Sequence, residues 1–428
     1  MNRMQKTLPD RFFAGAIHCA VLLLAFTAAS ADDYRDARAE LVTAYEAQDY
    51  PAMRAAALKS LDARPGFAGG LFNLALAEVL GGDADAALHA LNALLAKKID
   101  FSADELDEFA PLHDLPGWDA YASAVAELYN PVGDATIAYR HWQRDFIPEG
   151  IAAGTGGELY LGSIRHGEIV RVGKTLARAS DGPHWSVFGM RLAADGRLWF
   201  VSSAISEFAE LDPADEGKTG LFAVDTNSGE IVVRALLHGT GNKQVLGDLI
   251  LVDADTLLLA DQADGIVYRY TISSGEFTIV VERGHFGSPQ GLTLDESGDH
   301  LYVADYIGGL YRLRLATGEI ERVTPLDSAS DYGIDGLYRY GNKLIAIQNG
   351  IRPNRVVEFE LSADGGAVVA SRILAMNLPE FDEPNLGVIR DNEFLFIANS
   401  HWNRFERDGS LPDDLSRPAV LKIDLQPD

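Results

Sequence analysis

The sequence contains one cysteine, Cys19, in 428 residues, and no block of lysine or arginine. A chain without a second cysteine forms no internal disulfide, and the part after residue 31 has no thiol for catalysis or for a zinc site. The formal net charge is -27, with charges of both signs spread along the chain. Nucleic acid and anionic membrane surfaces are therefore poor partners.

Long apolar runs are also missing. The apolar run at residues 20–26 is too short to span a bilayer. It follows Arg3, Lys6 and Arg11 and precedes the small-residue sequence Ala29-Ser30-Ala31, which is typical of a cleaved signal peptide. We expect residues 1–31 to be this signal, and the mature chain to be periplasmic or secreted without a membrane span. A thiol-free mature chain suits such an oxidising compartment.

A repeated unit is clearest at residues 288–323. Four short apolar or alternating runs, separated by turn-forming residues, predict a four-stranded antiparallel meander. Similar units begin every 40 to 60 residues or so, which predicts a mainly β fold, a six-bladed β-propeller. Their first strands start at Glu149-Gly150-Ile151, Phe188-Gly189-Met190, Gly247-Asp248-Leu249, Gln290-Gly291-Leu292, Asp335-Gly336-Leu337 and Asn385-Leu386-Gly387.

Residues 33–128 have a different pattern, rich in alanine and leucine at helical spacing. Gln48-Asp49-Tyr50-Pro51-Ala52 aligns with Gly82-Asp83-Ala84-Asp85-Ala86 at an offset of 34 residues, a period that resembles tetratricopeptide repeats. We therefore expect a small helical domain at 32–130 and the propeller at 131–428. The helices either present a concave surface to a partner protein or form a cap that packs on the propeller.

The residues that start the innermost strands of a propeller lie around one end of its central channel. Carboxylates gathered there would repel each other, and a hard cation with oxygen ligands resolves the repulsion. Ca²⁺ suits carboxylate and amide oxygens best. The alternative is that these residues are turn formers that face solvent or cap loop amides. The candidate metal ligands are Glu149, Asp248, Gln290, Asp335 and Asn385.

The segments Pro148-Glu149-Gly150 and Asp335-Gly336-Leu337, with the blade motifs between them, resemble the senescence marker protein/gluconolactonase family over residues 144–425. The resemblance implies a lactone hydrolase whose metal is held by a Glu, two Asn and an Asp. Glu149 matches the Glu and Asp335 the Asp, whereas the Asn positions fall on Gly247 and Gln290. In the family the metal-binding Asp is also the base, and this role would fall on Asp335.

Histidines in loops of the same face are alternative bases, with a pKa suited to proton transfer near neutrality. These catalytic candidates are His184 and His285. Polar and aromatic residues in nearby loops are candidates for contacts with a small organic ligand, and an arginine there could orient a carboxylate. These substrate-binding candidates are Arg165, His166, Asn349, Arg352, His401 and Trp402.

Two functions follow from these patterns. The first is an exported hydrolase that uses a divalent cation, with Ca²⁺ preferred, to polarise the carbonyl of a lactone or ester. The second is a non-catalytic propeller that binds a small ligand or a partner protein. The incomplete ligand set and the added helical region favour the second function.

Overall fold

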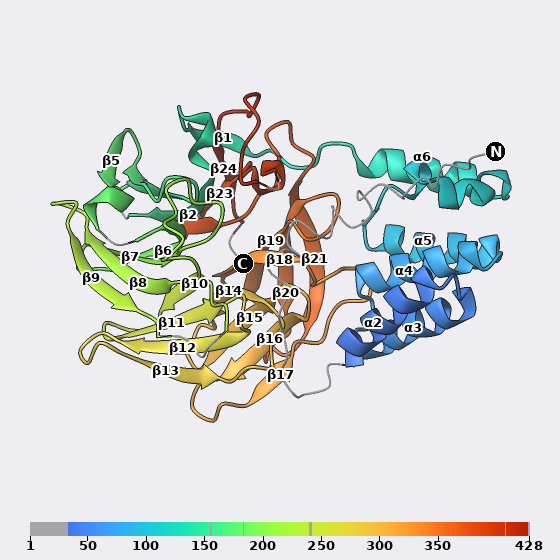
Figure 1. Cartoon of the computed structure of the whole chain (residues 1–428), viewed down its shortest axis with the longest axis horizontal. Helices are drawn as coiled ribbons and strands as arrows, with labels where there is room; N and C mark the ends of the chain where they lie inside the picture. The colour runs from blue at the N-terminus through green and yellow to red at the C-terminus, as the bar shows by residue number, and fades with distance from the viewer. Residues whose placement is uncertain (1–32, 155, 183, 239–241, 407, 427–428) are drawn as a thin grey trace.

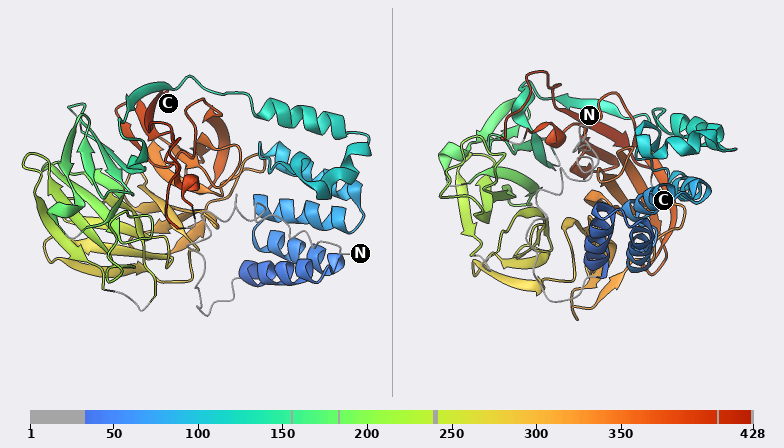
Figure 2. Two further views of the ribbon diagram at one scale, coloured as in Figure 1. Left: turned by 45° about the horizontal axis from the view of Figure 1, so that its top comes forward. Right: turned by 45° about the vertical axis from the view of Figure 1, so that its right-hand side comes forward.

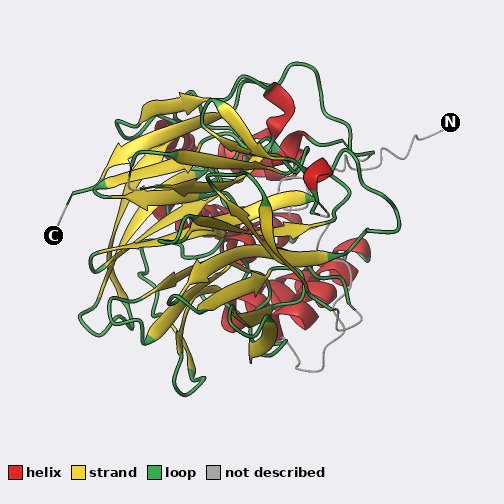
Figure 3. Ribbon diagram, turned by 90° about the vertical axis from the view of Figure 1, so that its left-hand side faces the viewer, coloured by secondary structure: helices red, strands yellow, loops and turns green. Residues whose placement is uncertain are grey.

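The computed structural model describes residues 33–154, 156–182, 184–238, 242–406 and 408–426. The predicted signal peptide at 1–31 lies outside these ranges. Six four-stranded antiparallel sheets form a ring, so the predicted six-bladed propeller is confirmed. Helices gather beside this ring, and strands and loops make up most of the rest (Figure 3). Among the residues described, no helix has the length and apolar character needed to cross a bilayer.

Within each blade the strands follow one another from the channel outward. Blade 1 contains β2 (Pro148–Ala153), β3 (Leu159–Ser163), β4 (Ile169–Arg171) and β5 (Lys174–Ala177). Blade 2 contains β6 (Ser186–Leu192), β7 (Arg197–Ser203), β8 (Thr219–Asp225) and β9 (Ile231–Leu236). Blade 3 contains β10 (Leu246–Leu251), β11 (Thr256–Asp261), β12 (Ile266–Thr271) and β13 (Glu276–Val281). Blade 4 contains β14 (Pro289–Leu294), β15 (His300–Asp305), β16 (Gly309–Arg314) and β17 (Ile320–Arg322). Blade 5 contains β18 (Ile334–Tyr340), β19 (Lys343–Gln348), β20 (Arg355–Leu361) and β21 (Val368–Met376).

Blade 6 joins the two ends of the propeller. It contains β22 (Gly387–Arg390), β23 (Glu393–Ile397) and β24 (Ala419–Asp424), and its outermost strand is β1 (Thr136–Arg140). β1 pairs antiparallel with β24, with Ile137 opposite Leu421. The ring is therefore closed by hydrogen bonds between strands from opposite ends of the sequence (Figure 1).

The innermost strands approach each other backbone to backbone, which explains the glycine that follows Glu149, Gln290 and Asp335. A Cβ atom at Gly150 would lie 2.3 Å from the carbonyl oxygen of Phe188 in the next blade. At Gly291 a Cβ atom would lie 2.6 Å from the backbone nitrogen of Leu337. Only glycine permits this spacing. The inner strands consequently pack tightly around a narrow channel.

The strand-start residues sit in irregular backbone. Register shifts leave Glu149, Gly247 and Gln290 without a partner on the second strand of blades 1, 3 and 4. In blade 5 the shift includes Asp335 and Gly336. Such bulges re-aim side chains relative to the sheet. In these four blades the equivalent position of the inner strand is therefore released from the ladder.

The helical region contains α2 (Asp33–Glu46), α3 (Tyr50–Ala63), α4 (Ala68–Leu80), α5 (Ala84–Ala96), the short 3₁₀ helices η2 (Ala103–Glu105) and η3 (Asp107–Asp114), and α6 (Trp118–Leu128). Asp49 caps α3 by accepting from the backbone nitrogen of Ala52, and Asp83 caps α5 in the same way through Ala86. The two aligned aspartates thus have the same structural role. Membership of the tetratricopeptide class stays a prediction.

The helices pack against blade 5 (Figure 2). Ile351, from the loop between β19 and β20, is 2% exposed and belongs to the apolar core of the helical region. The backbone nitrogen of Asp100 donates to the carbonyl oxygen of Arg352 at 2.9 Å, and the rings of Phe67 and Tyr332 lie 5.1 Å apart. The helical region is therefore joined to a loop at the end of the channel where the inner strands begin.

Candidate carboxylate site at the channel mouth

Glu149 lies at the start of β2 and is 7% exposed. Its Oε2 atom accepts from Asn385 Nδ2 and from Trp402 Nε1, both at 2.5 Å. These donors come from the loop before β22 and from the 3₁₀ helix η6 (Trp402–Arg404). Among the contacts of the described residues, Oε1 accepts no hydrogen bond. One carboxylate oxygen is therefore held by neutral donors and the other is left for a ligand.

Asp335 is held in the same manner from blade 5. Its Oδ2 atom accepts from Asn349 Nδ2 at 2.6 Å, and Oδ1 receives no hydrogen bond from the part of the chain that is described. Asn349 follows β19 directly, and its own Oδ1 is buried without a hydrogen-bond partner. Buried acceptors of this kind are rare and call for an explanation such as a bound ion.

The two carboxylates influence each other. Burial is the main cause that raises the pKa of Asp335, to about 7; the hydrogen bond from Asn349 opposes the increase, and the charge of Asp248 adds to it. Burial also raises the pKa of Glu149 well above its usual range, and the charge of Asp335 raises it further. A bound cation would favour the charged form of both groups.

Glu383 is a third carboxylate near this site, and sequence reasoning missed it. Burial raises its pKa to about 7; the hydrogen bond from the backbone nitrogen of Asn403 opposes this shift, and the charge of Asp335 adds to it. That hydrogen bond is 2.6 Å long. The nearby positive charge of Arg352, whose residue is exposed, lowers the pKa of Glu383. Glu383 precedes the predicted ligand Asn385 by only two residues, and this short distance in the sequence could have indicated that Glu383 lies near the site.

The strand-start residue is Gly247 in the third blade and Gln290 in the fourth. At Gly247 an added Cβ atom would lie 2.2 Å from Gln262 Oε1, so the side chain of Gln262 fills the space that a side chain at 247 would occupy. In blade 4, Gln290 donates from Nε2 to Ser288 Oγ at 3.1 Å. Both blades therefore present a glutamine amide near the channel.

Asp248 takes part in different interactions. It is 1% exposed, and Arg191 Nη2 lies 3.2 Å from its Oδ1. The same Nη2 donates a hydrogen bond to Asp248 Oδ2 at 3.3 Å, whereas Oδ1 accepts none from the described residues. Its Oδ2 accepts from the backbone nitrogen of Leu292 at 3.1 Å. Asp248 thus connects blades 2, 3 and 4 through a buried ion pair.

The two catalytic histidine candidates lie in unlike surroundings. His184 is 2% exposed, with Nε2 2.9 Å from the carbonyl oxygen of Gly167 and its ring 5.4 Å from that of Phe200. His285 is exposed on the loop that leads into β14. The hydrogen bonds that Glu149 and Asp335 accept from described side chains come from Asn385, Trp402 and Asn349, and not from these histidines. The packing of His184 is that of a structural side chain.

Other loop candidates are distributed around the mouth. Arg165 Nη1 donates to the carbonyl oxygen of Gly409 at 2.9 Å, and His166 Nε2 lies 3.1 Å from Asp145 Oδ2. His401 is fully buried, and its Nδ1 lies 3.0 Å from Asp382 Oδ2. The hydrogen bond from His401 is the main cause that lowers the pKa of Asp382. Of the predicted substrate-binding residues, Trp402 and Asn349 contact the two site carboxylates directly.

The donor set fits a hard cation better than a transition metal. Among the residues in the described ranges, no group of three or more His, Cys, Asp or Glu is arranged to hold a metal ion. A cation here would therefore depend on Glu149, Asp335 and neutral amide oxygens, including Asn349 Oδ1. Such a mixed oxygen set suits Ca²⁺, which accepts flexible coordination.

No protein-family model matches the chain, and no curated protein matches it. Similar solved structures include regucalcin from Agrobacterium tumefaciens, described as a calcium-binding protein, at 15% identity over 68% of this chain and 96% of that chain, with a TM-score of 0.47. A PQQ-bound aldose sugar dehydrogenase from Streptomyces coelicolor is 14% identical over 68% and 99%, with a TM-score of 0.46. A putative gluconolactonase is 16% identical over 68% and 94%, with a TM-score of 0.45. These similarities concern the fold, and the fold assignment of this chain rests on its own strand pairing.

Proposed function

We propose that the chain is an exported metal-dependent hydrolase of lactones or esters, resembling gluconolactonases, with a divalent cation at the channel mouth. The observation that carries this proposal is the arrangement of Glu149, Asp335 and Asn349. Each carboxylate has one oxygen fixed by neutral N–H donors. Among the described residues, its other oxygen accepts no hydrogen bond, and the buried Asn349 Oδ1 has no hydrogen-bond partner either. We infer that Ca²⁺ is the preferred ion.

When bound, the cation would polarise the carbonyl of the substrate and stabilise the negative charge on its oxygen. Asp335 is the proposed base because its carboxylate lies at the proposed cation site and has one oxygen, Oδ1, that accepts no hydrogen bond from the described residues. It takes a proton from water as the water oxygen bonds to the carbonyl carbon. The bond between this carbon and the ring or alkoxy oxygen then breaks, and the proton passes to the departing oxygen. The products are a carboxylic acid and an alcohol, joined in one molecule for a lactone.

Trp402 and Asn385 would favour the charged form of Glu149 that binds a cation. Their hydrogen bonds to Oε2 lower the pKa of Glu149 against the larger effect of burial. The exposed side chain of Arg352, near Glu383, is a proposed contact for an anionic group of the substrate. These residues make the rim of the mouth polar and leave Trp402 as an aromatic surface for a small organic molecule.

A second candidate is a non-catalytic propeller that binds a small ligand or a partner protein through the helical region. Two observations favour it. The described residues contain no ready group of three acidic or histidine ligands, and Asp248 is engaged by Arg191. Under this alternative, the burial that raises the pKa values of Glu149 and Asp335 would favour their neutral forms, which bind neutral polar groups.

A screen of lactones and aryl esters, with calcium and with chelator, distinguishes these candidates. Hydrolysis that requires calcium and is lost in Glu149→Gln supports the enzyme. Glu296→Gln, in an exposed turn of blade 4, is the matched control and should retain the activity. Absence of calcium-dependent hydrolysis across the screen, with a folded protein, would favour the binding function.

A further inference from the structure

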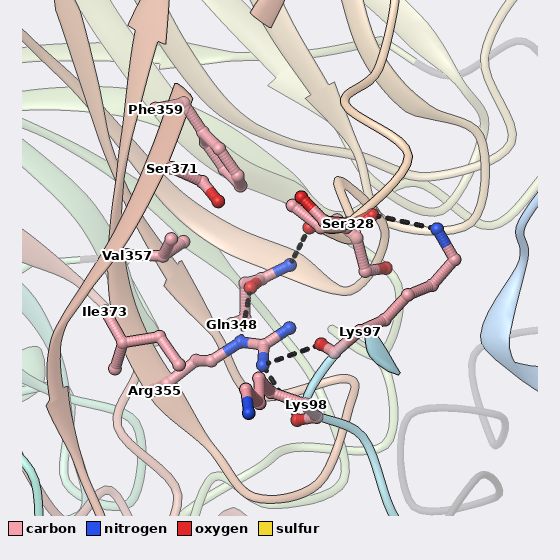
Figure 4. A pocket seen from close by; sticks show the side chains of 11 residues that line it. Lys97, Lys98, Ser328, Gln348, Arg355, Val357, Phe359, Ser371 and Ile373 are labelled. Carbon is pink, nitrogen blue, oxygen red and sulfur yellow. Dashed lines mark hydrogen bonds between the residues drawn. The ribbon is translucent and has the colours of Figure 1, made fainter. Parts of the chain in front are cut away.

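A small cavity lies between the helical region and blade 5, separate from the channel mouth (Figure 4). Its volume is about 40 Å³. The polar and charged residues that line it and bear on its chemistry are Lys97, Lys98, Ser328, Ser330, Arg355 and Ser371. The lining therefore carries three basic side chains and no acidic one.

Arg355, the first residue of β20, is 3% exposed. Its Nε donates to Gln348 Oε1 at 2.8 Å, and its Nη1 donates to the carbonyl oxygens of Lys97 and Lys98 at 3.3 and 2.9 Å. Its Nη2 makes no hydrogen bond within the described ranges. Figure 4 shows the guanidinium of Arg355 among the side chains that line the cavity, between Gln348 and the backbone of Lys97 and Lys98. The guanidinium thus has one nitrogen to which the described residues offer no acceptor, on a residue of the cavity lining.

The charge of Arg355 has no acidic partner among the residues described. Burial alone lowers the pKa of Arg355, to about 10. The carbonyl groups at the C-terminal end of α5 offer only the partial negative charge of the helix dipole. Lys97 Nζ donates to the carbonyl oxygens of Asp327 and Ala329 at 2.5 and 3.2 Å, and the carboxylates of Asp327 and Asp331 interact with its charge and raise its pKa against the larger effect of burial. A buried charge without a full counterion is costly, which favours an ion from solution.

We propose that this cavity binds a small inorganic anion of the chloride, sulfate or phosphate class. The Nη2 group of Arg355 would donate to it, and the hydroxyls of Ser328 and Ser371, which are exposed at the edge of the cavity, lie on the same lining. A volume of about 40 Å³ exceeds the roughly 10–15 Å³ that one water needs and is too small for a nucleotide or a sugar phosphate. The anion would complete the pairing of Arg355 and hold the helical region on blade 5.

The test measures the melting temperature of the full chain while chloride, sulfate and inorganic phosphate are titrated separately. Ionic strength is held constant with a gluconate salt, whose bulky anion carries no sulfate-like or phosphate-like group. Binding to the folded state predicts a saturable rise of a few degrees, since only the native protein forms the site. Isothermal titration should give one anion per chain. A rise with sulfate and phosphate alone identifies an oxyanion site, and a rise with chloride as well identifies a general anion site.

The decisive variant introduces a carboxylate into the cavity lining, where it would take the place of the bound anion. Ser328→Asp places a negative charge on the cavity lining and should raise the melting temperature without added anion and abolish the anion-dependent rise. Ser274→Asp, in the exposed turn between β12 and β13, is the matched control and should keep the full rise. Equal anion responses in both variants, or no response in the wild type, would overturn the proposal. Since the measured quantity is stability, the outcome is independent of hydrolase activity.

Discussion

Asn349 donates from Nδ2 to Asp335 Oδ2 at 2.6 Å, while its own Oδ1 is buried without a partner. Leaving a buried acceptor unsatisfied costs roughly 1–3 kcal/mol. A water or cation beside Asp335 would remove this cost. The same side chain therefore orients the proposed base and offers an oxygen to the proposed ion.

Replacing Asn349 by leucine tests this double role. Asn349→Leu removes the hydrogen bond that lowers the pKa of Asp335 and also removes the amide oxygen. We expect calcium affinity to fall about tenfold or more, an effect of about 1.4 kcal/mol or more on the binding free energy. Isothermal titration at pH 8 measures it. Unchanged affinity in a folded variant would exclude Asn349 from the site.

Stability should depend on pH through Asp335. Its pKa is about 7 in the folded protein and 3.8 for an ordinary aspartate, so between these values the native state holds a proton that the unfolded state releases. The stabilisation is complete below pH 4, falls as the pH rises towards 7, and is lost above it. Asp335→Asn removes this contribution. Without calcium, its unfolding free energy relative to wild type should rise by about 1–3 kcal/mol from pH 4.5 to pH 8, as urea unfolding can measure.

The ion pair between Arg191 and Asp248 should be structural. Arg191→Met leaves a buried carboxylate without its cation and should lower stability by about 3–5 kcal/mol. Adding Asp248→Leu should recover most of the loss, because two apolar groups replace the pair. Chemical denaturation of the single and double variants measures this. Full loss of calcium binding in the stable double variant would instead support Asp248 as a metal ligand, as the sequence predicted.

The third blade offers a gain-of-affinity test. Gln262 occupies the space next to Gly247, so an asparagine at 247 needs that side chain to be shortened. We expect the double variant Gly247→Asn, Gln262→Ala to bind calcium about tenfold more tightly than wild type, while Gly247→Asn alone loses stability. Calcium titrations and thermal melts of both variants distinguish the outcomes. Weaker binding by the double variant would imply that Gln262 itself supplies an oxygen.

The six blades could be predicted because strand alternation, turn residues and the repeated glycine are local patterns. Their regular recurrence placed Glu149 and Asp335 at equivalent strand starts, and the register shifts agree with this equivalence. Pairing of β1 with β24 joins segments about 280 residues apart and leaves no local pattern. The position of the Gln262 side chain and the convergence of Glu383 depend on loop conformations, which a repeat alignment does not describe. In blade 3 the residue released by the register shift is Gly247, as the repeat alignment predicted, and the ligand candidate Asp248 pairs with Ala260.

Calcium titration of the metal-free protein at pH 8, with wild type and Asp335→Asn side by side, tests the central claim most directly. One calcium per wild-type chain, with binding lost or reduced at least a hundredfold in Asp335→Asn, is the predicted result. Equal binding by both proteins, or no binding by the folded wild type, would contradict a cation held between Glu149 and Asp335.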